Sequence, residues 1–227
     1  MQHNLTHLAI IMDGNARWAT KNGKTKSEGH NLGAKNAKRI IKHALKLDIK
    51  YLTLYAFSSE NWQRPAKEVS MLVNLLSHYV KNETELLKKH QIKLQVIGDL
   101  SKLPSSLVEK IEESMSITKD NTKMTVNIAF SYGAREEITN ACQKAIESGI
   151  KEVTQESFRK FLYDPNMPDV DILVRTGGTH RLSNFLLWQI SYAEIYFLDM
   201  FWPDFNEENL DQIIENYSKR TRNFGAR

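Results

Sequence analysis

Residues 7–18 read HLAIIMDGNARW, an apolar run that is too short for a helix and that leads directly into polar residues. This pattern is typical of a buried strand that ends at a ligand site, because ligands of open α/β sheets sit beyond the carboxyl ends of the strands. Gly14 lets a ligand approach the backbone closely. Asp13 offers a hard oxygen to Mg²⁺, while Arg17 and the backbone N–H groups around the glycine suit phosphate oxygens. The stretch predicts a site for an anionic, metal-bound ligand, with an ordinary polar turn as the alternative.

Apolar runs and amphipathic stretches alternate along the rest of the chain. Strands are expected at residues 7–12, 51–57, 94–97, 124–130, 171–174 and 195–198. Helices are expected at residues 32–47, 66–89, 105–117, 134–147, 155–162, 185–189 and 207–222. Strands separated by helices imply parallel pairing with right-handed crossovers. The sequence therefore predicts one doubly wound α/β domain over residues 1–227, with a mainly parallel sheet of about six strands.

Composition bounds the setting in which the protein works. The chain has a single cysteine, Cys142, which falls among apolar positions of an expected helix and is therefore expected to be buried and inert. The sequence has no signal-peptide pattern and no apolar stretch near the roughly 20 residues of a membrane span. These features predict a soluble protein of the cytoplasm.

The positive charges gather in one region. Between Arg17 and Lys50 there are ten lysines and arginines against two acids, within a net charge of +4. Part of this is the solvated face of a helix, but the residues before that helix predict an anion-binding loop. Nucleic acid is the weaker candidate as a ligand, because the chain has no run of basic residues and no nucleic-acid-binding motif.

Three further polar motifs follow expected strands. They read SSENWQRP at residues 58–65, SYGAR at 131–135 and RTGGTHRLSN at 175–184. In the last motif, Arg175, Arg181 and a serine surround a Gly-Gly turn, an arrangement suited to a second phosphate. The alternative is a surface turn with two solvated arginines. Together with the Asp13 motif, this one favours two anionic groups bound side by side at one edge of the sheet.

Taken together, the motifs DGNARW, SSENWQRP and RTGGTHRLSNFLLWQ, with EIYF at 194–197 and WPDF at 202–205, resemble the cis-prenyltransferase family, which includes the bacterial undecaprenyl diphosphate synthases. The resemblance covers nearly the whole chain. It implies a homodimeric α/β domain with a hydrophobic tunnel. The implied reaction condenses isopentenyl diphosphate repeatedly onto an allylic diphosphate, expected to be farnesyl diphosphate. The implied product is a long-chain polyprenyl diphosphate, expected to be undecaprenyl diphosphate for cell-wall synthesis, released through peripheral contact with the membrane.

The resemblance also assigns residues. It makes Asp13 the essential carboxylate and, with Glu194, a ligand of Mg²⁺, and it matches Asn61 to a residue associated with proton removal. The positions matching substrate-binding residues are Gly14, Asn15, Ala16, Arg17, Trp18, Lys26, His30, Ser58, Ser59, Glu60, Trp62, Arg64, Arg175, Arg181, Leu182 and Ser183. Ala16, Thr179, Ser131 and Ala134 depart from the usual family pattern, and these departures bear on loop mobility and substrate affinity instead of the reaction class.

The apolar stripe of the expected helix 66–89 fits either core packing or one wall of the tunnel. Met124 resembles the position that closes the far end of the tunnel, although plain core is the alternative. Two other function classes compete with the prenyltransferase. A phosphatase of the haloacid-dehalogenase kind needs a second aspartate where Asn15 stands, and a non-catalytic partner subunit usually loses the carboxylate and arginines that remain here.

Overall fold

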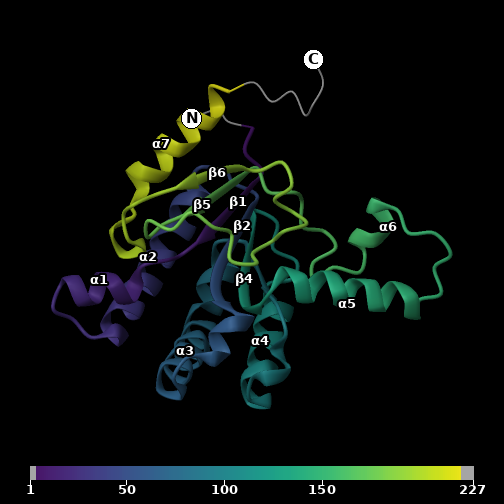
Figure 1. Ribbon diagram of the computed structural model, residues 1–227, viewed down its shortest axis with the longest axis horizontal. Helices are drawn as coiled ribbons and strands as arrows, with labels where there is room; N and C mark the ends of the chain where they lie inside the picture. The colour runs from purple at the N-terminus through teal and green to yellow at the C-terminus, as the bar shows by residue number, and fades with distance from the viewer. Residues whose placement is uncertain (1–3, 221–227) are drawn as a thin grey trace.

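The computed structural model describes residues 4–220, which form a six-stranded, fully parallel sheet with helices around it (Figure 1). The strands are β1 (His7–Ile11), β2 (Tyr51–Ser58), β3 (Ile92–Ile97), β4 (Met124–Tyr132), β5 (Ile172–Arg175) and β6 (Glu194–Phe197). Their order across the sheet is β3-β4-β2-β1-β5-β6. The α/β fold with parallel pairing is therefore confirmed.

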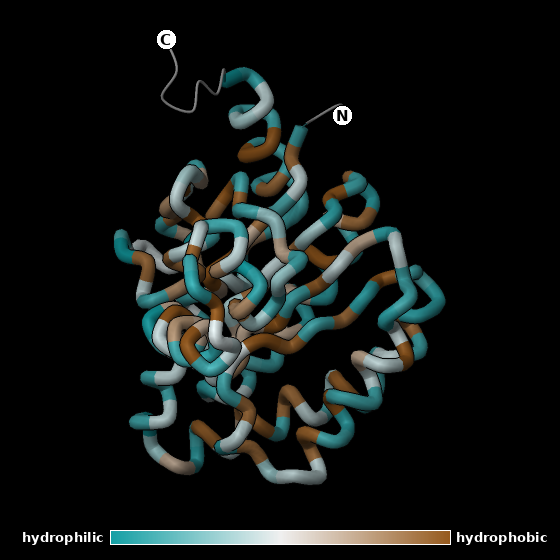
Figure 2. Tube along the Cα trace, turned by 90° about the vertical axis from the view of Figure 1, so that its right-hand side faces the viewer, coloured by the Kyte–Doolittle hydropathy of each residue, from teal (hydrophilic) through white to brown (hydrophobic). Residues whose placement is uncertain are grey.

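The helices connect the strands in the expected alternation. They are α1 (Asn15–Lys21), α2 (Lys26–Lys46), α3 (Ala66–Lys89), α4 (Ser105–Thr118), α5 (Ala134–Glu147), α6 (Gln155–Arg159) and α7 (Glu207–Ser218). Single 3₁₀ turns form η1 (Ser59–Gln63), η2 (Leu100–Lys102) and η3 (Trp202–Asp204). Hydrophobic and hydrophilic residues follow one another at short intervals along the chain (Figure 2). A helix with this pattern turns an apolar side toward the interior and a polar side toward water.

The central strand β1 shows how the sheet divides the core. Leu8 and Ile10 belong to one buried cluster with residues of α2 and α7, whereas Ala9 and Ile11 belong to another with the first residue of α5. Side chains of a strand alternate between its two faces, so one short apolar run supplies both layers. The run 7–12 is a strand buried on both sides, and the strand itself ends at Ile11.

Some local predictions were wrong. Residues 185–189 form turns instead of a helix, and Ser183, Asn184 and Leu186 nearby have positive φ angles, which no helix contains. Cys142 lies on the exposed side of α5 instead of in the core. The segment expected as a loop before residue 32 is helical, because Thr25 and Glu28 form a capping box that starts α2 earlier.

The part of the chain between residues 4 and 220 contains no helix that is both long and apolar enough to cross a membrane. The end of the expected helix 207–222 beyond residue 220 lies outside the described residues.

Candidate active site

Asp13 stands just beyond the carboxyl end of β1, where three segments of the chain hold it. Its carboxylate accepts hydrogen bonds from Nη2 of Arg17 at 3.0 Å and from Nη2 of Arg175 at 2.9 Å. Its backbone carbonyl accepts from the hydroxyl of Thr176 at 2.8 Å and from the backbone N–H of Trp202 at 3.0 Å. The carboxylate is therefore fixed in place and flanked by two cationic side chains that can hold an anion.

Two glycines make room for this arrangement. Gly14 has a φ of +106°, and a Cβ atom there would lie 2.6 Å from the ring of Phe201. Gly177 has a φ of +90°, and a Cβ there would lie 2.7 Å from Nη2 of Arg17. The guanidinium carbon of Arg17 in turn lies 5.5 Å from the centre of the Phe201 ring, a cation–π distance. Phe201 was missed by sequence reasoning, because only the fold brings it beside the Asp13 motif.

Arg175 joins the two anion sites that the sequence predicted. Its side chain is only 4% exposed, and while one nitrogen binds Asp13, Nη1 donates to Oγ of Ser183 at 2.7 Å and to the carbonyl of Arg181 at 2.5 Å. Nε of Arg181 lies 3.3 Å from the same Ser183 oxygen. The positive φ angles around Ser183 turn the chain back toward Arg175. The structure thus brings both motifs together at one edge of the sheet.

The turn after β2 forms a third part of this rim. Oδ1 of Asn61 accepts the backbone N–H of Ser58 at 3.1 Å, so the Asn61 side chain caps the turn. Nε1 of Trp62 donates to Ser131 at 2.9 Å. Oε1 of Glu60 accepts from Asn184 at 3.1 Å, which ties the turn to the segment that carries Ser183. Asn184 is a positioning residue that the sequence interpretation did not single out.

A cluster of charged side chains lies where α2 and α3 begin. Glu68 binds Lys26 at 3.3 Å and Arg64 at 3.0 Å. Although burial raises the pKa of the Glu68 carboxyl, the hydrogen bond from Lys26 and the charges of Lys26 and Arg64 outweigh it and bring the pKa below its usual value. Burial lowers the pKa of His30 in the same cluster, and its Nε2 has no hydrogen-bond partner among the described residues. The neutral imidazole is therefore favoured.

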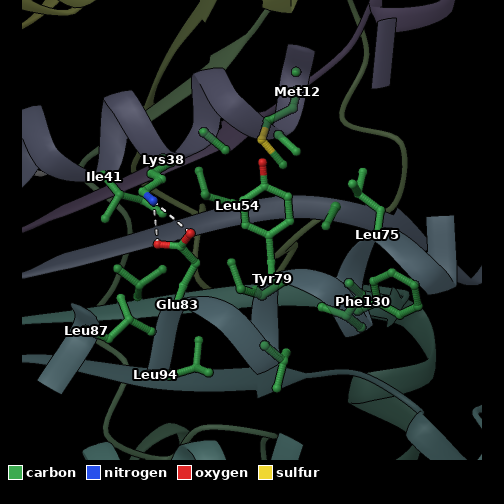
Figure 3. A pocket seen from close by; sticks show the side chains of 18 of the residues that line it. Met12, Lys38, Ile41, Leu54, Leu75, Tyr79, Glu83, Leu87, Leu94 and Phe130 are labelled. Atoms are coloured by element: carbon green, nitrogen blue, oxygen red, sulfur yellow. Dashed lines mark hydrogen bonds and ion pairs between the residues drawn. The ribbon is translucent and has the colours of Figure 1, made fainter. Parts of the chain in front are cut away.

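Next to this rim, an apolar cavity of about 400 Å³ lies between α2, α3 and the sheet (Figure 3). Met12 and Asn15, which flank Asp13 in the chain, both line it, as does His30. The wall is otherwise mostly aliphatic and aromatic, with Leu54, Leu76, Leu87, Leu94 and Phe130 among its residues. The stripe of α3 is therefore a cavity wall along much of its length. A charged rim opens into an apolar space of a size typical for small-ligand pockets.

Two residues lie away from the places expected for them. Glu194 begins β6 and pairs with Ile172 at the amino-terminal ends of the strands, whereas Asp13 follows the carboxyl end of β1. There Glu194 binds Arg220 at 3.0 Å and the hydroxyl of Tyr196 at 3.0 Å. At about 3.3 Å per residue it lies roughly 15 Å from Asp13 along the strand direction, so the two carboxylates of one chain cannot share a metal ion.

Met124 is 2% exposed and packs in the core cluster of β1 and α2 instead of lining the cavity. The expectation that it forms the end of the tunnel is therefore not supported.

Three substrate-binding candidates lie at the margin of the site. Trp18 donates from Nε1 to Asp204 at 2.7 Å, Leu182 packs against the α5 side of the sheet, and Ala16 lies partly exposed on α1.

Metal ligation rests on few groups. Within residues 4–220, no three histidine, cysteine, aspartate or glutamate side chains gather where they could hold an ion. Mg²⁺ is commonly bound in proteins by one or two carboxylates together with phosphate oxygens and water. Asp13 alone at the rim fits that mode, with the remaining ligands supplied by a phosphorylated ligand.

Comparisons with known proteins point to one family. The family model described as "Putative undecaprenyl diphosphate synthase" matches residues 11–225. An isoprenyl transferase of Rickettsia sibirica is 54% identical over 224 residues, which cover 99% of each chain.

Solved structures agree with this result. The lavandulyl diphosphate synthase of Lavandula x intermedia in complex with dimethylallyl diphosphate superposes with a TM-score of 0.93 at 36% identity, covering 97% of this chain and 98% of that one. A probable undecaprenyl diphosphate synthase of Campylobacter jejuni gives a TM-score of 0.85 at 37% identity and covers 99% and 100% of the two chains.

Proposed function

The chain belongs to the undecaprenyl diphosphate synthase family of prenyltransferases, and from that premise we propose its substrates and product. It condenses isopentenyl diphosphate repeatedly onto an allylic diphosphate, farnesyl diphosphate, in the cis configuration. The observation that carries the proposal is the charged rim around Asp13 that opens into an apolar cavity of about 400 Å³. A diphosphate with a hydrocarbon tail has the same two parts as this site.

The rim offers two places for diphosphates. We assign the allylic diphosphate to the side formed by Gly14, Arg17, Lys26 and His30, because His30 also lines the cavity that would receive the tail. The isopentenyl diphosphate goes to Arg181 and Ser183, on the other side of Arg175. Arg175 contacts both sides and sets their separation. Holding two reactants in a fixed geometry lowers the barrier of a bimolecular step.

Asp13 would hold Mg²⁺ in this proposal. When bound, the ion would neutralise the negative charge that develops on the departing diphosphate. The side chains of Arg17 and Arg175 each engage one carboxylate oxygen of Asp13, which places their positive charges beside the expected position of the phosphate oxygens. Glu194 is too far from Asp13 to bind the same ion within one chain.

Proton loss completes each condensation. A neutral amide is a poor base, and Oδ1 of Asn61 already accepts the Ser58 N–H. Its amide N–H groups remain available to orient a diphosphate oxygen that takes the proton. Ser58, Ser59 and Glu60 belong to the same turn, and the capping box between Ser58 and Asn61 fixes the amide at the rim.

We further propose undecaprenyl diphosphate as the product and cell-wall synthesis as its use. The protein would act as a homodimer of one domain over residues 1–227 in the cytoplasm, with peripheral contact with the membrane for release of an apolar product. The phosphatase alternative gains nothing from the structure, because Nδ2 of Asn15 donates to the backbone carbonyl of Met12 and the side chain offers no carboxylate.

The test is a reaction with purified protein, farnesyl diphosphate, radiolabelled isopentenyl diphosphate and Mg²⁺. Products are dephosphorylated and sized by reversed-phase chromatography and mass spectrometry. We expect Mg²⁺-dependent incorporation that ends at eleven isoprene units. Absence of incorporation, or a single addition only, would contradict the proposal, and a different final length would correct the product alone.

A further inference from the structure

One ion pair crosses the opening between the two helices that enclose the cavity. Nζ of Lys38 on α2 lies 2.7 Å from the carboxylate of Glu83 on α3. Figure 3 shows the ammonium group directed at both oxygens, beside apolar side chains such as Ile41 and Leu87. Both charged residues line the cavity themselves. The pair therefore spans the gap between α2 and α3 along the side of the apolar space.

A second ion pair ties the same helices at the mouth of the site. Lys26 of α2 binds Glu68 of α3 at 3.3 Å, where both helices begin. At about 1.5 Å per residue, the Lys38 and Glu83 pair lies roughly 20 Å further along the helices. Most of the wall between the two ties is apolar. The mouth pair belongs to the charged rim, whereas the distant pair serves no diphosphate.

The packing of α3 makes this distant tie important. On its α4 side the helix is held, because the hydroxyls of Thr84 and Ser114 lie 2.7 Å apart. Only Leu72, Val80 and Thr84 are buried among its 24 residues, because the cavity separates much of the helix from α2 and the sheet. In α2, by contrast, Ile40 and Ala44 are completely buried against the strands. A helix with few buried contacts is displaced at a lower cost than one that is packed into the core. Of the two walls, α3 is therefore the one that can move.

A growing prenyl product requires such a displacement of α3. A cavity of about 400 Å³ lies near the lower end of the range that encloses a drug-sized ligand, roughly 300–1,000 Å³. Each added isoprene unit needs more apolar space, so a long product requires α2 and α3 to separate. The side chains of the ion pair are 38% and 24% exposed, so water can solvate the two charges when the helices separate.

We propose that Lys38 and Glu83 form a latch that limits the separation of α2 and α3 and thereby the length of the prenyl chain. The inference rests on the proposed function, since it names what the cavity holds. The two residues touch neither diphosphate site and are specificity-determining residues of the wall. Loss of the latch lets α3 move further away, and longer chains form.

The experiment compares product lengths in wild type, Glu83→Gln, Lys38→Gln and the charge swap Lys38→Glu with Glu83→Lys. We expect both single variants to shift the main product by at least one isoprene unit toward longer chains. The charge swap restores the attraction and returns the distribution to that of wild type. Glu207→Gln is the matched control, because it breaks the Arg39 pair (3.2 Å) between α2 and α7, and neither of its members lines the cavity.

A second readout does not depend on turnover. Hydrogen–deuterium exchange of residues 72–87 is expected to rise in the two single variants, to return in the charge swap and to stay unchanged in the control. If wild type incorporates no isopentenyl diphosphate, the proposed function fails. If wild type elongates normally but the single variants keep its product length, or the swap does not restore it, the latch is overturned. Because Glu83→Gln and Lys38→Gln each remove one charge of the same ion pair, either variant tests the latch if the other does not fold.

Discussion

The charged rim and the apolar cavity are neighbours, but they are held together in different ways. At the rim, Asp13 is fixed by two arginines, a threonine hydroxyl and a backbone N–H. Around the cavity, α3 has few buried residues, and one ion pair far from the rim ties it to α2. Electrostatic catalysis needs groups that are already in place, whereas apolar contact is non-directional and tolerates a change of shape. The rim is built for fixed chemistry and the cavity for a tail of varying length.

The largest difference between the two regions is expected for the carboxylate itself. Asp13→Asn keeps the size of the side chain but removes the charge that a metal ion requires, so turnover should fall by on the order of 10⁴-fold, about 5.5 kcal/mol of barrier. The measurement is incorporation of radiolabelled isopentenyl diphosphate at saturating substrates, with thermal unfolding as the control for folding. Turnover within tenfold of wild type would remove Asp13 from the mechanism.

A core residue just outside the cavity should affect stability and leave product length alone. Met124→Ala removes a side chain that is 2% exposed and should lower the free energy of unfolding by about 2–5 kcal/mol. Denaturant titration measures this loss, and the product of the surviving folded enzyme should keep its length. Leu107→Ala, at a site 4% exposed on α4, is the matched control. Longer products from Met124→Ala alone would show that the cavity extends to the strand end.

Within the rim, the two arginines should separate the two substrates. Arg181→Ala should weaken binding of isopentenyl diphosphate by about 1.5–3 kcal/mol, roughly 10- to 150-fold, because a charge-assisted contact is lost. Arg17→Ala should weaken farnesyl diphosphate more. Isothermal titration calorimetry with each ligand in the presence of Mg²⁺ measures both constants. Equal losses for both ligands in both variants would contradict two separate sites.

The smallest effect on rate is expected in the cavity wall. Leu87→Ala enlarges the part of the cavity that is remote from the rim and should lengthen the main product, while Leu87→Trp fills it and should shorten the product. Initial turnover should stay within about threefold of wild type, since the residue touches no diphosphate. Chromatographic sizing checks the shift. The same product length in both variants would place the growing chain outside this cavity.

The sequence predicted most of the fold because local signals agreed with the global arrangement. Helix α3 begins directly after Pro65, whose fixed φ suits a helix start, and its predicted bounds Ala66–Lys89 match the structure. The strands were found because apolar runs of four to eight residues separated by amphipathic helices leave few alternatives to a parallel sheet. The grouping of Asp13 with Arg175 followed from one rule, that parallel strands end at the same edge.

Other features could not be read from the sequence. The helix expected at residues 185–189 is absent, and Leu186 within that range has a positive φ angle. The residues just before it, Ser183 and Asn184, contact Arg175 and Glu60, which are distant in sequence. The apolar stripe on α3 has the same period whether the helix packs against the sheet or is separated from it by a cavity. The place of Glu194 at the opposite edge depends on the register of β6, which its four residues do not specify.

In our proposal, the rim and the cavity hold the two ends of one substrate. The direct measurement is photo-crosslinking with a farnesyl diphosphate analogue that carries a photoreactive group on its last isoprene unit, followed by peptide mass spectrometry. We expect crosslinks to cavity residues of α2 and α3, such as Ile41, Leu76 and Leu87, and we expect excess farnesyl diphosphate to abolish them. Crosslinks to α5 or α6, on the other side of the sheet, that excess farnesyl diphosphate abolishes would contradict the placement of the tail in this cavity.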